Sequence, residues 1–120
     1  KRLFLNLSNH PSQRWCDTQR EAASGFGEIM DIPFPKIDPN ATSAEVEALA
    51  RKCADDIIAI AGTAEVTAHV MGEMVFTHKL VNFLQAEGIH CVASTTEHIV
   101  EYNSDGSKTS VFRFLQFRDY

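Results

Sequence analysis

Three short polar segments carry most of the side chains in this sequence that could do chemistry. The first, residues 8–12 (SNHPS), follows the apolar run of residues 3–7. The second is residues 72–74 and the third is residues 94–96, and each of these also follows an apolar run. In an open α/β sheet, ligand sites lie just outside the carboxyl ends of the strands. We therefore expect the three segments to meet at one edge of a sheet and to form a single site.

His10 is the residue of the first segment best suited to catalysis. Near neutral pH a histidine can donate a hydrogen bond to a phosphate or act as general acid or base. Ser8 and Asn9 precede it, and Ser12 stands where a helix is expected to start, so that free backbone amides would favour an anion there. The alternative is a polar turn that contains a histidine. Arg14 could pair with a phosphate.

The second segment, Gly72-Glu73-Met74, lies between an expected strand and an expected helix. Glycine lets the backbone approach a ligand closely. Glu73 could accept a hydrogen bond from a ribose hydroxyl or act as a base, or it could be a first-turn glutamate that complements the helix dipole. The chain contains neither GxGxxG nor GxxxxGK[ST], which argues against an ordinary dinucleotide or P-loop site.

The third segment supplies the hydroxyls of Ser94, Thr95 and Thr96, which suit contacts with phosphates or base edges. Threonine is also common in strands for reasons of packing alone. Trp15 could stack on a base, but a core position is the simpler interpretation. His69 lies in an expected strand and is interpreted as a structural histidine of the sheet. The histidines lack paired ligand spacing, so no metal site is expected.

The spacing of apolar residues predicts strands and helices that alternate along the chain. Thr42 and Glu45 match a capping box, and Asp105-Gly106 indicates a hairpin turn. The expected strands are residues 3–7, 28–34, 65–71 and 89–94. The first helix is expected to be capped by Ser12 or Asp17 and to end near residue 24, and the other helices are 43–61 and 74–87. The hairpin strands are 96–102 and 109–117. This order predicts one α/β, Rossmann-like domain over residues 1–120, with a mainly parallel sheet, flanking helices and a C-terminal β-hairpin.

Composition narrows the classes of function. The chain has 120 residues and a formal net charge of −5, which argues against binding to long nucleic acid. It contains no apolar run long enough to cross a membrane and no signal-peptide pattern. The three cysteines are odd in number and form no CxxC, which is typical of reduced thiols. We expect a cytoplasmic protein without membrane partners.

Four segments together resemble the small stand-alone CRISPR-associated Rossmann-fold (CARF-like) proteins of type III systems, some of which are ring nucleases. These segments are LFLNLSNHPS, VMGEM, VASTTEHIVE and SVFRFLQFRDY. The resemblance implies a homodimer that binds a cyclic oligoadenylate, most often the four-membered ring, across its two-fold axis. It also implies cleavage without metal or cofactor, in which a ribose 2′-OH attacks the adjacent phosphate and the antiviral signal is switched off.

The resemblance maps onto the three segments already described. Residues 8–10 match the family's loop after the first strand, residues 72–74 match its loop before the third helix, and residues 94–96 match its loop after the fourth strand. No lysine lies in these segments, although a basic residue often helps such sites, so Arg14 or Arg113 could replace it. The resulting expectation is a ring nuclease in which His10 and Glu73 are catalytic. The alternatives are a sensor or sponge that binds without cutting, and a nucleotide-handling protein outside CRISPR defence.

Overall fold

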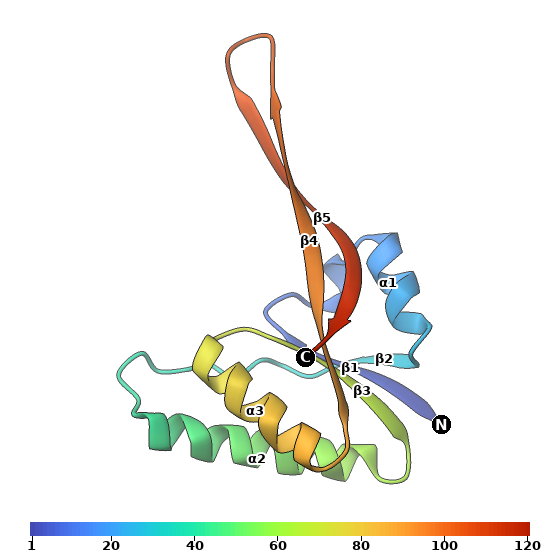
Figure 1. The fold of residues 1–120 in the computed structure, drawn as a ribbon, viewed down its shortest axis with the longest axis vertical. Helices are drawn as coiled ribbons and strands as arrows, with labels where there is room; N and C mark the ends of the chain where they lie inside the picture. The colour runs from blue at the N-terminus through green and yellow to red at the C-terminus, as the bar shows by residue number, and fades with distance from the viewer.

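In the computed structural model, which describes residues 1–120, strands and helices alternate along the chain as the apolar spacing predicts (Figure 1). The helices are a 3-10 turn (Ser12–Arg14), α1 (Asp17–Ser24), α2 (Ser43–Ala61) and α3 (Met74–Ala86). The strands are β1 (Arg2–Ser8), β2 (Glu28–Asp31), β3 (Glu65–Met71), β4 (His90–Tyr102) and β5 (Lys108–Asp119). None of the helices is both long and apolar enough to span a membrane.

One five-stranded sheet has the order β2-β1-β3-β4-β5. The pairs β2–β1, β1–β3 and β3–β4 are parallel, and only β5 runs antiparallel to its neighbour β4. The predicted α/β fold with a mainly parallel sheet and a C-terminal hairpin is therefore confirmed. The parallel register brings the carboxyl ends of β1 and β3 together, since Ser8 pairs with Met71.

The start of α2 shows how local sequence determines an element. The Thr42 hydroxyl accepts a hydrogen bond from the Glu45 amide at 3.1 Å, and the Glu45 carboxylate accepts one from the Thr42 amide at 3.1 Å. This is the predicted capping box. The helix then buries a stripe at helical spacing: Val46, Ala50, Ala54 and Ile57.

The two faces of the sheet are built from alternate residues of the same strands. Leu3, Leu5 and Leu7 of β1 belong to a cluster of 15 buried residues that includes side chains of α2 and α3. Phe4 belongs to a second cluster of four buried residues on the α1 side. Side chains point alternately to opposite faces of a strand, so Asn6 and Ser8 share the α1 side with Phe4.

Two element boundaries differ from the predictions, and a third falls at one of two predicted positions. β2 ends at Asp31 instead of residue 34, because Pro33 and Pro35 have no N–H to donate to the edge of the sheet. The helix expected to be capped by Ser12 or Asp17 begins at Asp17, since the extended backbone of Trp15 and Cys16 separates it from the 3-10 turn.

The second difference concerns residues 94–96, which were expected to form a loop after a strand that ends at residue 94. They lie inside β4, which continues to Tyr102 with only an irregularity between Thr95 and Thr96. The strand continues because β5 pairs with it from Val92 to Tyr102 and supplies partners for its backbone groups. Residues 96–113, in which the two strands and their turn project beyond the body of the domain, are called the arm (Figure 1).

Candidate functional site

A cavity of about 660 Å³ lies at the carboxyl ends of β1 and β3, between the start of α1 and the hairpin strands. Its lining includes seven of the residues expected to form the site: Ser8, Asn9, His10, Arg14, Gly72, Ser94 and Thr96. The lining is completed by Trp15, Cys16, Gln19, His69, Met71, Phe112 and Phe114. The three segments expected to meet therefore do contribute to one cavity, and the arm supplies part of its wall.

Ser12 and Glu73 lie outside this lining, and each makes a different contact. The Ser12 hydroxyl donates to the Asp31 carboxylate at 2.9 Å, which ties the 3-10 turn to the end of β2. The Glu73 carboxylate accepts a hydrogen bond from the Phe76 amide at 2.7 Å and so caps the start of α3. The geometry thus makes Glu73 the N-cap of α3, whereas the expected alternative to a base was a glutamate in the first turn of the helix.

Thr95 and Met74 also lie outside it. Thr95 lies between two cavity residues of β4 and donates its hydroxyl to the Gln116 carbonyl at 3.2 Å. Successive side chains of a strand alternate between its faces, so Ser94 and Thr96 can line the cavity only if Thr95 does not. Met74, at the start of α3, is 83% exposed and lines a different cavity.

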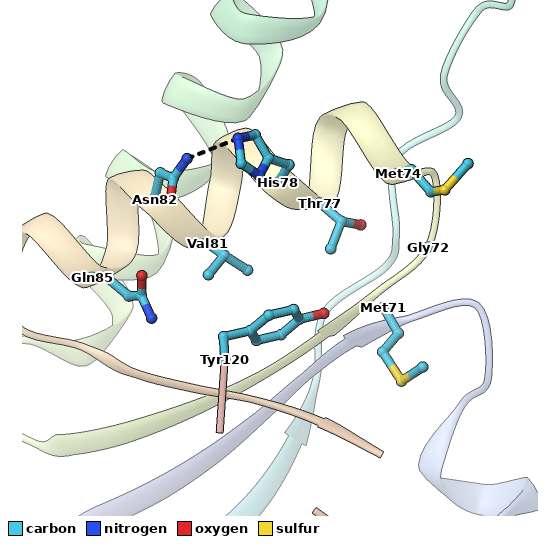
Figure 2. A pocket seen from close by; sticks show the side chains of 9 residues that line it. All are labelled: Met71, Gly72, Met74, Thr77, His78, Val81, Asn82, Gln85 and Tyr120. Atoms are coloured by element: carbon cyan, nitrogen blue, oxygen red, sulfur yellow. Dashed lines mark hydrogen bonds between the residues drawn. The ribbon is translucent and has the colours of Figure 1, made fainter. Parts of the chain in front are cut away.

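That second cavity, of about 470 Å³, lies along α3 (Figure 2). Figure 2 shows Thr77 and Val81 of α3 facing the ring of Tyr120. The Tyr120 hydroxyl donates to the Val70 carbonyl, and the Thr77 hydroxyl is buried without a partner. Met71 and Gly72 line both cavities, so the end of β3 separates the two sites.

A buried hydrogen-bond network forms the floor of the first cavity. The Asn6 side-chain oxygen accepts a hydrogen bond from the Ser8 hydroxyl at 2.8 Å and lies 2.9 Å from Nδ1 of His69. The Asn6 side-chain nitrogen donates to the His10 carbonyl and to the Asp31 carboxylate, both at 2.9 Å. Asn6 therefore joins β1, β3, the first loop and the end of β2.

This network assigns the tautomer of His69. The Asn6 side-chain nitrogen donates to the His10 carbonyl and to the Asp31 carboxylate, which can only accept. The Asn6 atom that faces His69 is therefore the oxygen, and Nδ1 of the His69 ring must carry the proton. Nε2 then presents a lone pair, and it is buried without a hydrogen-bond partner. Burial lowers the pKa of His69 to about 4, with a smaller contribution from His10, so the ring is neutral at pH 7.

Aromatic rings hold His69 in place. Phe4 stacks on its ring with centroids 6.0 Å apart, and Trp15 and Phe117 meet it edge-on at 5.6 and 5.2 Å. Trp15 is itself only 8% exposed, and its indole N–H is buried without an acceptor. One free acceptor and one free donor thus lie on adjacent side chains of the cavity lining.

The electrostatics of the lining favour a ligand with modest negative charge. Arg14 is its only lysine or arginine, and it contains no aspartate or glutamate. On the arm, Phe112 is 69% exposed and stacks on His98 with ring centroids 4.6 Å apart. An exposed aromatic surface beside a single cation can hold a flat ring and an anionic group together.

Cys16 adds a thiol to the same lining. It precedes the first residue of α1, and a hydrogen bond from the Gln19 backbone amide lowers its pKa. The thiol is exposed and has no adjacent general base among its hydrogen-bond partners. We therefore assign it no part in the chemistry.

The sequence interpretation missed that His69 and Trp15 line the cavity. His69 was interpreted as a structural histidine and Trp15 as a core residue, and both are indeed buried. A signal was present, because Asn6 interrupts the apolar run LFLNL and His69 interrupts the strand EVTAHVM. Asn6 of β1 and His69 of β3 pair directly with each other in the sheet.

Comparison with known proteins identifies a family. No curated protein matches the chain. The sequence matches the family described as Uncharacterized protein MJ1673 family over residues 2–118. Because this match covers almost all of its 120 residues, the chain belongs to the MJ1673 family.

Proposed function

We propose that this protein is a cytoplasmic ring nuclease of the CARF-like type, which binds a cyclic oligoadenylate in the cavity at the ends of β1 and β3. Cleavage of the ligand switches off type III CRISPR antiviral signalling. One observation carries the proposal: residues from all three expected segments, among them Ser8, His10, Gly72 and Ser94, line the same cavity. The resemblance of these segments to the CARF-like proteins supplies the ligand.

The size of the cavity supports a dimeric arrangement of the site. A cavity of about 660 Å³ is of the size that holds a drug-sized ligand. A ring of four adenylates is several times larger than such a ligand. Two copies of the chain related by a two-fold axis would present two equivalent cavities to one ring. We therefore propose that the active form is a homodimer.

The proposed reaction is an in-line displacement at phosphorus. The oxygen of a ribose 2′-OH attacks the adjacent phosphate and its proton passes to water, while the bond from phosphorus to the 5′ oxygen breaks. His10 acts as the general acid that protonates this leaving oxygen, and Arg14 holds the phosphate. The products are a 2′,3′-cyclic phosphate and a 5′-hydroxyl. The main contribution of the protein is alignment of the three reacting atoms.

A second candidate is a sensor or sponge that binds the ring without cutting it. The position of Glu73 favours this alternative, because its carboxylate caps α3 instead of lining the cavity. The site then has His10 as the acid and no carboxylate to act as base. A binding protein needs only the donors and the aromatic surface of the lining.

Incubation of the purified protein with cyclic tetra-adenylate and EDTA, followed by separation of the products, tests the proposal. We expect linear products that end in a 2′,3′-cyclic phosphate. Intact ligand that remains tightly bound would support the sensor or sponge. If the protein binds no cyclic oligoadenylate of any ring size, both candidates are wrong, and a nucleotide-handling role outside CRISPR defence becomes the better hypothesis.

A further inference from the structure

We propose that His69 and Trp15 recognise the adenine base of the ligand, with His69 as hydrogen-bond acceptor and Trp15 as donor. This inference rests on the proposed function and identifies the part of the ligand that the cavity recognises by hydrogen bonds. The acceptor is Nε2 of His69, and the donor is the indole N–H of Trp15. Both side chains line the cavity, and neither atom has a partner within the protein.

The acceptor character of His69 comes from its neighbours. The Asn6 oxygen, which also receives the Ser8 hydroxyl, requires a proton on Nδ1 and so leaves the lone pair on Nε2. Ring contacts at 5.2 to 6.0 Å on three sides fix the orientation of the imidazole. A buried acceptor without a partner destabilises a folded protein. Its presence is explained if the ligand supplies the missing donor.

The hydrogen-bond donor of the pair is the indole N–H of Trp15, whose ring lies next to that of His69. Indole nitrogen can only donate, and that of Trp15 has no acceptor in the protein. The two rings meet edge-on with centroids 5.6 Å apart, so the free donor and the free acceptor belong to side chains in contact. In the proposed pose the ligand satisfies both with a donor and an acceptor on neighbouring atoms of one edge.

Adenine has such an edge, because its exocyclic amine is a donor beside a ring nitrogen that accepts. Hypoxanthine, the base of inosine, carries a carbonyl oxygen where adenine has this amine. In the same pose that oxygen would face the lone pair of His69, and two acceptors repel each other. The exposed ring of Phe112 on the arm offers a stacking surface for the base.

Contact with the base requires a small movement of the cavity wall. The unpaired atoms of His69 and Trp15 are both buried, with almost no exposed surface. Rotation of a wall side chain would open them, and entry of the base would replace the wall atoms with hydrogen-bond partners. The proposal therefore predicts that the bound base forms hydrogen bonds with Nε2 of His69 and with the indole N–H of Trp15, which have no partner within the protein.

Isothermal titration of the full chain with cyclic tetra-adenylate and cyclic tetra-inosinate tests the inference. We expect the wild-type protein to bind the adenylate ring about 10-fold or more tightly than the inosinate ring. His69→Asn keeps an amide that can donate to Asn6 but removes Nε2, and it is expected to abolish this preference. Trp15→Phe keeps an aromatic ring but removes the donor, and it is expected to weaken binding of the adenylate ring several-fold.

The matched control is His90→Asn, which changes a histidine at the amino end of β4, outside the cavity lining. It is expected to keep the full preference for adenine. Equal binding of the two rings by the wild-type protein would overturn the base assignment and leave the proposed function intact, and this result needs no folded variant. An unchanged preference in His69→Asn would also overturn it. Failure of the wild-type protein to bind either ring would overturn the proposed function and the base assignment together.

Discussion

The two faces of the sheet differ in how completely helices cover them. On one face α2 and α3, with 19 and 13 residues, help to bury a cluster of 15 residues. On the other face α1 has only eight residues and helps to bury a cluster of four. The short helix leaves the carboxyl ends of β1 and β3 uncovered, and the cavity lies there.

Two neighbouring residues of β1 show how the two faces of the sheet differ. Leu5 and Asn6 are both buried, with 0% and 2% exposure. Leu5 packs into the larger cluster, whereas Asn6 organises the polar network beneath the cavity. Burial alone therefore does not distinguish the face that carries the larger apolar cluster from the face that carries the cavity. What separates them is whether the buried groups are apolar or hydrogen-bonded toward a cavity.

The strongest way to test this division is His10→Ala on the cavity face. If His10 is the general acid, its loss should lower the cleavage rate by about 10²–10⁴-fold and change ligand affinity much less. Single-turnover cleavage and equilibrium binding of cyclic tetra-adenylate separate the two effects. His78→Ala serves as control, because His78 lies on α3 and lines only the second cavity. An unchanged rate in His10→Ala would remove His10 from the mechanism.

Leu5→Ala tests the opposite face. Removal of a fully buried leucine should lower the free energy of unfolding by about 2–5 kcal/mol, while the folded fraction keeps its rate of cleavage. Ser94→Ala on the cavity face should cost less than about 1 kcal/mol, because Ser94 is only partly buried. Urea denaturation measures both. Equal losses of stability would contradict the division of roles between the two faces.

The titration of His69 provides a third test, through the pH dependence of stability. Its pKa is about 4 in the folded protein against an ordinary value of 6.5. At pH 7 His69 is neutral in both the folded and the unfolded chain, and its contribution to the free energy of unfolding is fully present. As the pH falls from about 6.5 to about 4, the unfolded chain gains a proton that the folded chain does not, so stability is lost. The total is on the order of 3 kcal/mol.

Urea denaturation at several pH values between 7 and 4 measures this loss. Other groups titrate in the same range, so the comparison is with His69→Asn, which lacks the imidazole. The variant should be less stable at pH 7 and should lose less stability than the wild-type protein as the pH falls. Parallel curves for the two proteins would mean that His69 titrates as an exposed histidine does.

The sequence predicts those parts of the fold that depend on local signals. Thr42 and Glu45 lie three residues apart, and their capping box forms as expected. The end of the fourth strand could not be predicted in this way. β4 continues past residue 94 because it pairs with β5, and that pairing is a property of two segments instead of one.

The site follows the same rule. The meeting of residues 8–10, 72 and 94 in one cavity follows from strand order, which the sequence pattern predicts. The role of His69 depends on Asn6, which lies 63 residues earlier in the chain and pairs with it across the sheet. No local pattern contains that contact. The position of Thr95 outside the cavity depends on the alternation of a strand where a loop was expected.

The smallest expected effect belongs to Glu73, which caps the start of α3. If it only caps the helix, Glu73→Ala should lower the free energy of unfolding by roughly 1 kcal/mol and leave the cleavage rate per folded molecule unchanged. Glu73→Gln keeps an oxygen that can accept from the Phe76 amide, so it should lose less stability than Glu73→Ala. The two variants separate the cap from the chemistry. Loss of cleavage in the well-folded Glu73→Gln would assign the carboxylate to catalysis, and the active site would then extend from the cavity to the start of α3.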